Sequence, residues 1–322
     1  MTGRGRGLLV ASVLAAVLVT VATTAALLLV DPKQPKAEAI KTGGLAGGAV
    51  VALYALWLND RRRRLEEARH DLEGEKLADE KFARAIELLG NEADQVRVGA
   101  MHVLAELTRT SPRYKQTVLS VLCAYLRRPF EHVALRVRAE DPEQAFSGSE
   151  REVSPEEDRE MTVRMTAQRL ITDMLPWGAD PDGTPYQLDL TGAKLVHFRL
   201  EGRRFGRLVA RRAQFYGITQ FGAVELAKPA LFSGATFHGR VNFRDGRFDG
   251  GLSFQDTTFL GEVDVTGATV GTFLHLSPQP PRPQVGALEV LPGAAMRVEP
   301  NGWRLTGDGQ PGTGLQGHVQ QD

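Results

Sequence analysis

The stretch from Ala230 to Phe259 reads ALFSGATFHGRVNFRDGRFDGGLSFQDTTF, and it decides how the C-terminal half of the chain folds. Phenylalanine recurs in it at alternating intervals of five and six residues, a spacing that matches neither an α-helix nor an ordinary β-hairpin. Followed outward, the spacing defines 17 anchor positions, of which 16 are Leu, Phe or Val: Leu190, Leu195, Leu200, Phe205, Ala210, Phe215, Phe221, Leu226, Phe232, Phe237, Phe243, Phe248, Phe254, Phe259, Val265, Val270 and Leu276.

A second set of positions, two residues before each anchor, supports the same pattern. Only one of these second positions is charged, Arg203. Two inward residues separated by one outward residue indicate a short strand, and strands at a fixed period indicate a solenoid. Up to Phe215 every interval is five, and after it every second interval gains a residue, so we expect the coils to become longer from there on. Arg203 and Ala210 depart from the pattern and predict a distorted second coil.

The segments LDLTGAKL (Leu188–Leu195) and GATF (Gly234–Phe237) resemble the pentapeptide-repeat family. The resemblance covers residues 186–276 and implies a right-handed, four-sided (quadrilateral) β-helix with one unit on each side. With its helical segment VLSVLCAYLRRPF (Val118–Phe130), the chain is also similar to membrane-anchored pentapeptide-repeat proteins of actinobacteria. The expected fold class is therefore α+β.

Two apolar runs near the N-terminus predict a transmembrane hairpin within residues 1–58. Leu8–Val30 contains 23 residues without a charge, which as a helix would span about 34 Å. Thr42–Leu58 supplies 17 more. A signal peptide cleaved after Ala39 is the competing interpretation, but the first run is longer than such a peptide needs, which favours an uncleaved helix.

The arginines Arg61, Arg62, Arg63 and Arg64 follow the second run directly. Such a cluster at the end of a membrane helix is a topology signal for the cytoplasmic side. The sequence thus predicts a multi-pass protein of the inner (plasma) membrane, with both termini and the soluble part in the cytoplasm. The same arginines could contact anionic headgroups, although a topology signal needs no such contact.

Residues 59–175 predict an α-helical segment. Short amphipathic helices are expected over 94–108, after Ser111-Pro112, and from a capping box at Ser154. The stretch around Val96–Leu104 resembles a HEAT-type helical hairpin, and an acidic linker occupies residues 139–153. The tail, 277–322, is rich in Pro and Gly; its part near 286–306 either covers the end of the solenoid or is disordered like the remainder.

No set of residues in the sequence indicates catalysis. The single cysteine, Cys123, falls in an apolar helical turn, and the seven histidines never reach metal-ligand spacing. The glycines Gly307, Gly309 and Gly312 match a dinucleotide fingerprint only formally, because no strand precedes them and no helix follows. We therefore predict no catalytic, cofactor-binding or metal-binding residues, no cofactor, and no enzymatic activity.

The net charge of zero, from 39 basic and 39 acidic residues, conceals an uneven distribution. One cluster within the first coils is strongly basic and forms the candidate basic patch: Arg199, Arg203, Arg204, Arg207, Arg211 and Arg212. Such a patch could bind anionic lipid, nucleic acid or an acidic partner surface. The alternative is a hydrated surface of an arginine-rich protein.

These features favour a non-enzymatic, membrane-anchored scaffold that presents a rigid solenoid to a cytoplasmic protein partner. Binding of anionic lipid through the arginines is the alternative. A third hypothesis is a DNA mimic that protects a topoisomerase, as the family resemblance suggests. Residues 189–276 carry 11 basic and 8 acidic side chains, whereas mimicry needs an acidic surface, so nucleic-acid-related roles are disfavoured. The partner stays unidentified and oligomerisation stays open.

Overall fold

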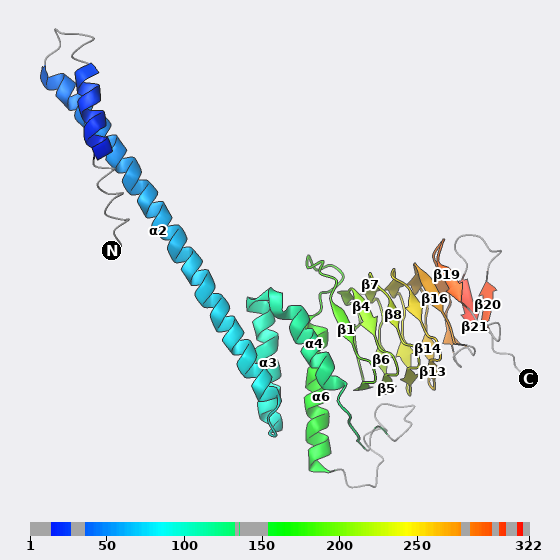
Figure 1. Cartoon of the computed structure of the whole chain (residues 1–322). Coiled ribbons are helices and arrows are strands. Elements are labelled where there is room, and N and C mark those ends of the chain that lie inside the picture. Colours follow the sequence, from blue (N-terminus) through cyan, green and yellow to red (C-terminus); the bar gives the residue numbers. More distant parts are fainter. Residues whose placement is uncertain are drawn as a thin grey trace, which may run out of the picture. The chain divides into compact units, whose positions relative to one another are not determined.

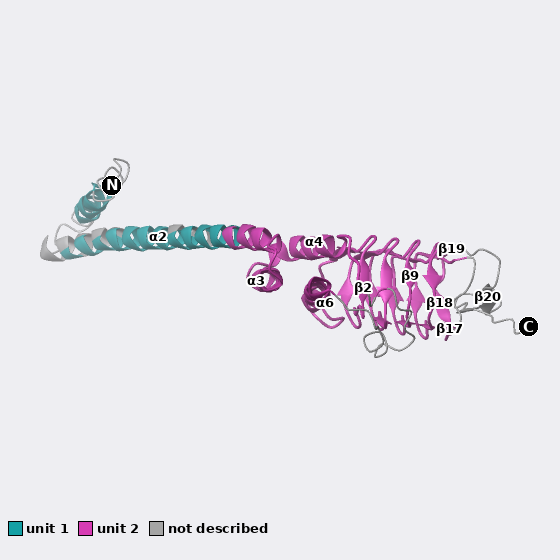
Figure 2. Cartoon of the chain, turned by 90° about the horizontal axis from the view of Figure 1, so that it is seen from below, with its two compact units in different colours: residues 1–79 teal, residues 80–322 magenta. Residues whose placement is uncertain are grey.

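The chain divides into two compact units, residues 1–79 and 80–322 (Figure 2). The computed structural model describes residues 14–26, 36–132, 135, 154–277, 284–297, 303–306 and 314–317. Residues 27–35, the acidic linker 139–153 and the last residues of the tail therefore lie outside the described residues.

The first unit contains a helix over residues 14–26 and the N-terminal part of α2 (Lys36–Leu89). Among the described residues, no helix is both long and apolar enough to cross a membrane. The second run lies inside α2, where four glycines dilute it and Asn59 and Asp60 continue the helix.

This finding corrects two predictions. The transmembrane helices at 8–30 and 42–58 are contradicted, and so is a multi-pass protein of the plasma membrane with a cytoplasmic soluble part. The predicted helices rested on the length and hydrophobicity of two sequence runs, and the predicted location rested in addition on the arginine cluster that follows the second run. Among the described residues, no helix combines the length and the hydrophobicity that a membrane span needs.

In the second unit, α3 (Asp94–Thr110), the short 3-10 helix η1 (Pro112–Tyr114), α4 (Lys115–Leu126) and α6 (Pro155–Met174) pack beside the C-terminal end of α2. The predicted start of α6 is confirmed, because the Ser154 hydroxyl accepts a hydrogen bond from the Glu156 N–H at 3.3 Å. The buried Arg164 of α6 donates to the carbonyl of Leu126, the last residue of α4. The HEAT-like character of this segment stays a prediction.

The remainder of the unit is a solenoid with four faces, each a parallel sheet with one strand per coil (Figure 1). Face 1 contains β1 (Gln187–Asp189), β4 (Arg207–Val209), β8 (Ala230–Leu231), β12 (Leu252–Ser253), β16 (Phe273–His275) and β19 (Ala295–Arg297). Face 2 contains β2 (Lys194–Val196), β5 (Gln214–Tyr216), β9 (Thr236–Phe237) and β13 (Thr258–Phe259). Face 3 contains β6 (Thr219–Gln220), β10 (Val241–Asn242), β14 (Val263–Asp264) and β17 (Gln284–Val285).

Face 4 contains β3 (Arg204–Phe205), β7 (Glu225–Leu226), β11 (Arg247–Phe248), β15 (Thr269–Val270) and β18 (Leu288–Val290). It ends in the hairpin β20 (Trp303–Thr306) and β21 (Gly314–Gly317), in which β21 pairs antiparallel with β18. The strands β17, β18 and β19 show that the coils continue beyond Leu276. Whether the segment 286–306 acts as a cap stays a prediction.

Strand register confirms the predicted lengthening of the coils. Leu195 pairs with Phe215, and Phe215 pairs with Phe237, so each anchor pairs with the fourth anchor after it. All four intervals of the first pair are five, whereas two of the four in the second pair are six. The added residues lie at corners where neighbouring coils approach closely. At one such corner Gly217, Gly239 and Gly261 stack on one another, and a side chain on Gly239 would lie 2.8 Å from the carbonyl carbon of Gly217.

The interior of the solenoid is packed by the two sets of positions identified in the sequence. All anchors are buried except Phe259, which is half-buried, and every second position is buried. Phenylalanine rings stack from coil to coil, with 4.5 Å between the ring centroids of Phe215 and Phe237 and 5.1 Å between those of Phe237 and Phe259. The predicted solenoid is thus confirmed, while its handedness stays a prediction.

Candidate functional site

The first coil is the end of four parallel sheets, and its outward-facing backbone groups need partners. On face 2 the side chain of Gln168 in α6 supplies them. Its Oε1 accepts a hydrogen bond from the Val196 N–H at 3.1 Å, and its Nε2 donates to the Val196 carbonyl at 3.3 Å. One amide side chain therefore replaces the missing neighbouring strand.

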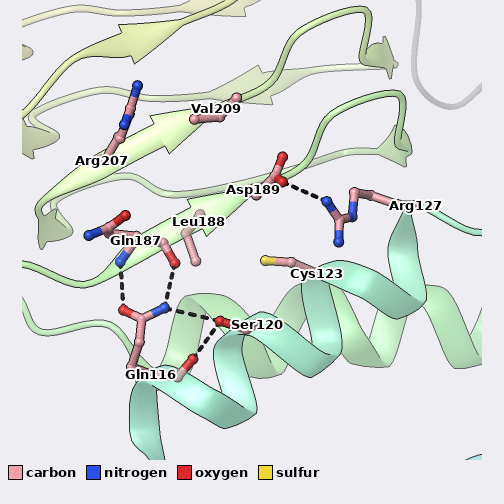
Figure 3. Close-up of a pocket in the computed structure, with 9 residues that line it drawn as sticks. All are labelled: Gln116, Ser120, Cys123, Arg127, Gln187, Leu188, Asp189, Arg207 and Val209. Atoms are coloured by element: carbon pink, nitrogen blue, oxygen red, sulfur yellow. Dashed lines mark hydrogen bonds and ion pairs between the residues drawn. The ribbon is translucent and has the colours of Figure 1, made fainter.

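Face 1 is closed in the same way by Gln116 of α4. Its Oε1 accepts from the Gln187 N–H at 2.8 Å, and its Nε2 donates to the Gln187 carbonyl at 2.9 Å (Figure 3). Two glutamines on two helices thus make the same pair of hydrogen bonds to two different edge strands. The two edge strands differ in burial: Val196 is 6% exposed, whereas Gln187 is an exposed residue.

The other two faces are closed by α6 and by the residues that follow it. On face 3 the Thr172 hydroxyl donates to the Arg199 carbonyl at 2.5 Å. On face 4 the Arg204 N–H donates to the Pro176 carbonyl at 2.8 Å, and the Gly178 N–H donates to the Gly202 carbonyl at 3.1 Å. The helical segment therefore contacts the free edge on all four faces of the first coil.

Arg203, the charged exception among the second positions, is explained by this closure. It points inward at the end of the solenoid and is 8% exposed. Its guanidinium donates to the Leu175 carbonyl at 2.8 Å and lies 3.9 Å from the ring centre of Trp177. Burial lowers the pKa of Arg203, and Asp173 opposes that effect. Arg203 lies in the first coil, where the residues that follow α6 supply these partners.

Ion pairs join α4 and the residue that follows it to the first coil and to the loop before its first strand. Lys115 of α4 lies 2.9 Å from Asp182, and Arg127 lies 2.5 Å from Asp189. Burial raises the pKa of Asp182, but hydrogen bonds from Lys115, Thr184 and Tyr186 outweigh it and hold the pKa well below its usual range. These pairs fix α4 against face 1.

The two glutamines give a matched test of the closure. We expect Gln168→Ala to lower the free energy of unfolding by about 2 kcal/mol, because it orphans the buried N–H and carbonyl of Val196. Gln116→Ala should cost less than about 1 kcal/mol, since water can reach the backbone of the exposed Gln187. Urea denaturation of the two variants measures both values; equal losses would show that burial at the edge does not matter.

A cleft of about 480 Å³ opens between α4 and face 1. Figure 3 shows its lining: Gln116, Ser120, Cys123, Arg127, Gln187, Leu188, Asp189, Arg207 and Val209. Arg127 pairs with Asp189 on one side of the cleft, and Arg207 and Val209 stand on β4 at the other. We take this cleft as the candidate functional site.

The thiol of Cys123 in this cleft is not a nucleophile at neutral pH. Burial raises its pKa to about 12, an effect that the Asp189 backbone and Arg127 only partly offset. Because the thiolate is the reactive form, the cysteine behaves as a packed side chain. Among the described residues, no group of three or more His, Cys, Asp or Glu side chains is placed to hold a metal ion.

A second cleft, of about 610 Å³, lies between α6 and faces 2 and 3. Its lining is more mixed, with Met165 and Ile218 beside Arg169, Asp173 and Arg199. Burial, and then the neighbouring Arg199, lower the pKa of His197 at its edge. The His197 ring already accepts from the Ile218 N–H at 3.3 Å, which gives it a structural role.

The structure does not gather the six arginines of the candidate basic patch on one face. Arg199 belongs to face 3, Arg203 and Arg204 to face 4, and Arg207 to face 1. Arg211 and Arg212 follow β4 in an exposed turn. Arg204 donates to the carbonyls of Asp180 and Asp182, so it holds the loop before the first strand.

The arginines Arg61, Arg62, Arg63 and Arg64 lie exposed on α2 in the first unit. Arg64 pairs with Asp60 at 2.8 Å, and the guanidinium of Arg61 lies 5.3 Å from the ring centre of Trp57. Both contacts are between neighbours on one helix. They assign no partner to this cluster.

The comparisons with known proteins agree with the geometry of the solenoid. Residues 221–269 match the family described as pentapeptide repeats (9 copies). The match falls on the part of the chain in which the coils are longer and phenylalanine stacks on phenylalanine. No curated protein and no solved structure matches the chain, so the likeness to a membrane-anchored actinobacterial type has no support. Residues 221–269 of the C-terminal solenoid are thus similar to pentapeptide repeats, and such a solenoid suggests a non-enzymatic scaffold or interaction protein.

Proposed function

We propose that the chain is a non-enzymatic scaffold that presents the outer faces of its solenoid to a protein partner. The observation that carries the proposal is the filled interior: side chains at both sets of inward positions pack against one another and leave the outside for function. The helices are consistent with this proposal, because Gln168 and Gln116 bond the edge strands of the first coil.

Binding of anionic lipid through the candidate basic patch has no such observation behind it. The six arginines lie on three faces and in one turn, and Arg203 is buried beneath Trp177. A flat membrane surface contacts one side of a solenoid at a time, so only a few of these charges could act together.

Proximity labelling tests the proposal. The full chain and a control that ends at Pro185, before the first strand, are each fused to the same labelling enzyme and expressed in the native cells. We expect a set of proteins labelled by the full chain and absent with the control. The same labelled set with both would contradict a scaffold that works through its solenoid.

A further inference from the structure

The four faces of the solenoid differ in the charge that they present outward. On face 4 the outward residues of successive strands include Arg204, Glu225, Arg247 and Glu289. Face 3 carries Arg199 and Asp264 with an amide pair between them, in which Asn242 donates to Gln220 at 3.0 Å. These two faces carry charged or strongly polar side chains on most strands, although the outward column of face 3 ends in the exposed Val285.

Face 2 has an uncharged outward column, but the chain itself covers its beginning. Val196 and Tyr216 are buried in a cluster with Phe130, Leu135 and Met161. Tyr216 then stacks on His238, with 4.3 Å between the ring centroids. This face is therefore engaged in holding the helical segment.

Face 1 is different, because beyond the single charge of Arg207 on β4 its outward residues from Val209 to His275 on β16 form an uncharged stripe. We name it the face 1 stripe: Val209, Pro229, Leu231, Ser253, Phe273 and His275. Val209, Pro229 and Phe273 are half-buried, so part of each apolar side chain remains accessible, whereas Leu231 and Ser253 between them are buried and form the floor of the stripe. The Phe273 ring packs on the backbone of Gly251, where a side chain would collide with it.

The stripe begins at the cleft beside α4, since Val209 belongs to both, and the charges at that end are mainly positive. Arg127, Arg207 and Arg211 surround the single acid Asp189, which Arg127 already pairs. Among the described residues, the buried Nε of Arg207 has no hydrogen-bond partner. The cleft thus has cationic donors in excess next to an apolar surface.

We propose that face 1 docks an extended segment of a partner protein, with uncharged residues along the stripe and a carboxylate at Arg207. The inference rests on the proposed function and names the face and the chemistry of the partner. Successive coils lie about 4.8 Å apart, so the three steps from Val209 to His275 span about 14 Å. An extended chain covers that length with about five residues. A lipid or nucleic acid would instead need several phosphate contacts, whereas among the described residues that line the cleft Arg207 is the one cation without an ion pair.

Site-specific photo-crosslinking in the full chain tests the inference. A photoreactive phenylalanine analogue replaces Phe273 on face 1, Asn242 on face 3 or Thr269 on face 4. We expect a protein crosslink from position 273, with more Asp and Glu than Lys and Arg near the crosslinked site. Arg207→Glu should lower its yield about tenfold, and the milder Arg207→Gln less. Arg240→Glu, an exposed arginine on face 3, makes the same charge change and should leave the yield unaltered.

Each other outcome contradicts the inference. Crosslinks from 242 or 269 alone would assign the partner to another face and leave the proposed function standing. A basic crosslinked peptide, a crosslinked lipid or nucleic acid, or a yield indifferent to both Arg207 variants would refute the chemistry. If no position crosslinks, the proposed function fails together with the docking face.

Discussion

Replacing Phe232 with alanine should lower the free energy of unfolding by about 4 kcal/mol, because removal of a buried phenyl ring leaves a cavity. Phe232 is 0% exposed, and its ring neighbours five others, with centroid distances from 5.5 Å to Phe221 up to 6.2 Å to Phe215. Backbone hydrogen bonds join the adjacent coils, so the coils cannot relax freely into the cavity that the ring leaves. A loss of this size should lower the melting temperature by about 10 °C, which calorimetry measures.

Phe273→Ala is the matched control for this prediction. It removes the same ring from the outside of the solenoid, where Phe273 is only half-buried. We expect it to cost less than half as much as Phe232→Ala. If the two substitutions were equally destabilising, the inward and outward positions would not differ as the structure has them.

Gly239→Ala should be destabilising by about 3 kcal/mol, although it adds a single methyl group. The new side chain would meet the backbone of Gly217, with its carbonyl carbon 2.8 Å away, and backbone cannot rotate aside. The two coils would have to separate at that corner and stretch the neighbouring hydrogen bonds. Urea denaturation of the full chain gives the change in free energy.

The control for Gly239 is Gly183, a glycine in the loop before the first strand. An added methyl group there has nothing within 4 Å, so Gly183→Ala should change the stability by less than about 0.5 kcal/mol. A change below about 1 kcal/mol at Gly239 would mean that the coils have more space at this corner than the structure shows.

The solenoid could be predicted from the sequence because its inward positions repeat. Phe237 and Phe243 occupy the same inward position in successive units, so their spacing alone predicts which side chains are buried. The change of coil length could also be predicted, since an added residue shifts the position of every later phenylalanine. A repeat makes a long-range contact visible as a local pattern.

The contacts by which the helices cover the first coil could not be predicted from a repeat pattern. Gln116 and Gln168 act once each, on edge strands far along the chain at Gln187 and Val196, and nothing marks them among other helical glutamines. Arg203 gave the one signal, a charge at an inward position, and its partners Leu175 and Trp177 became evident only in the fold.

The placement of the six arginines of the candidate basic patch also could not be predicted from the sequence. Arg199, Arg203 and Arg207 are near in sequence, but a coil turns through a corner at every repeat unit and sends them to different faces. Clusters along a solenoid sequence therefore disperse, whereas residues one full coil apart come together. The face 1 stripe, with the paired members Leu231 and Ser253, is of the second kind.

Hydrogen exchange of the full chain, read residue by residue, tests most directly whether the helices close the solenoid into one body. The decisive amides are those of Val196 and Arg204, which bond Gln168 and the Pro176 carbonyl. We predict protection within about tenfold of the Phe232 amide, which bonds the Ser253 carbonyl inside the solenoid. Exchange of Val196 and Arg204 at the rate of an open strand edge, with Phe232 still protected, would contradict the account.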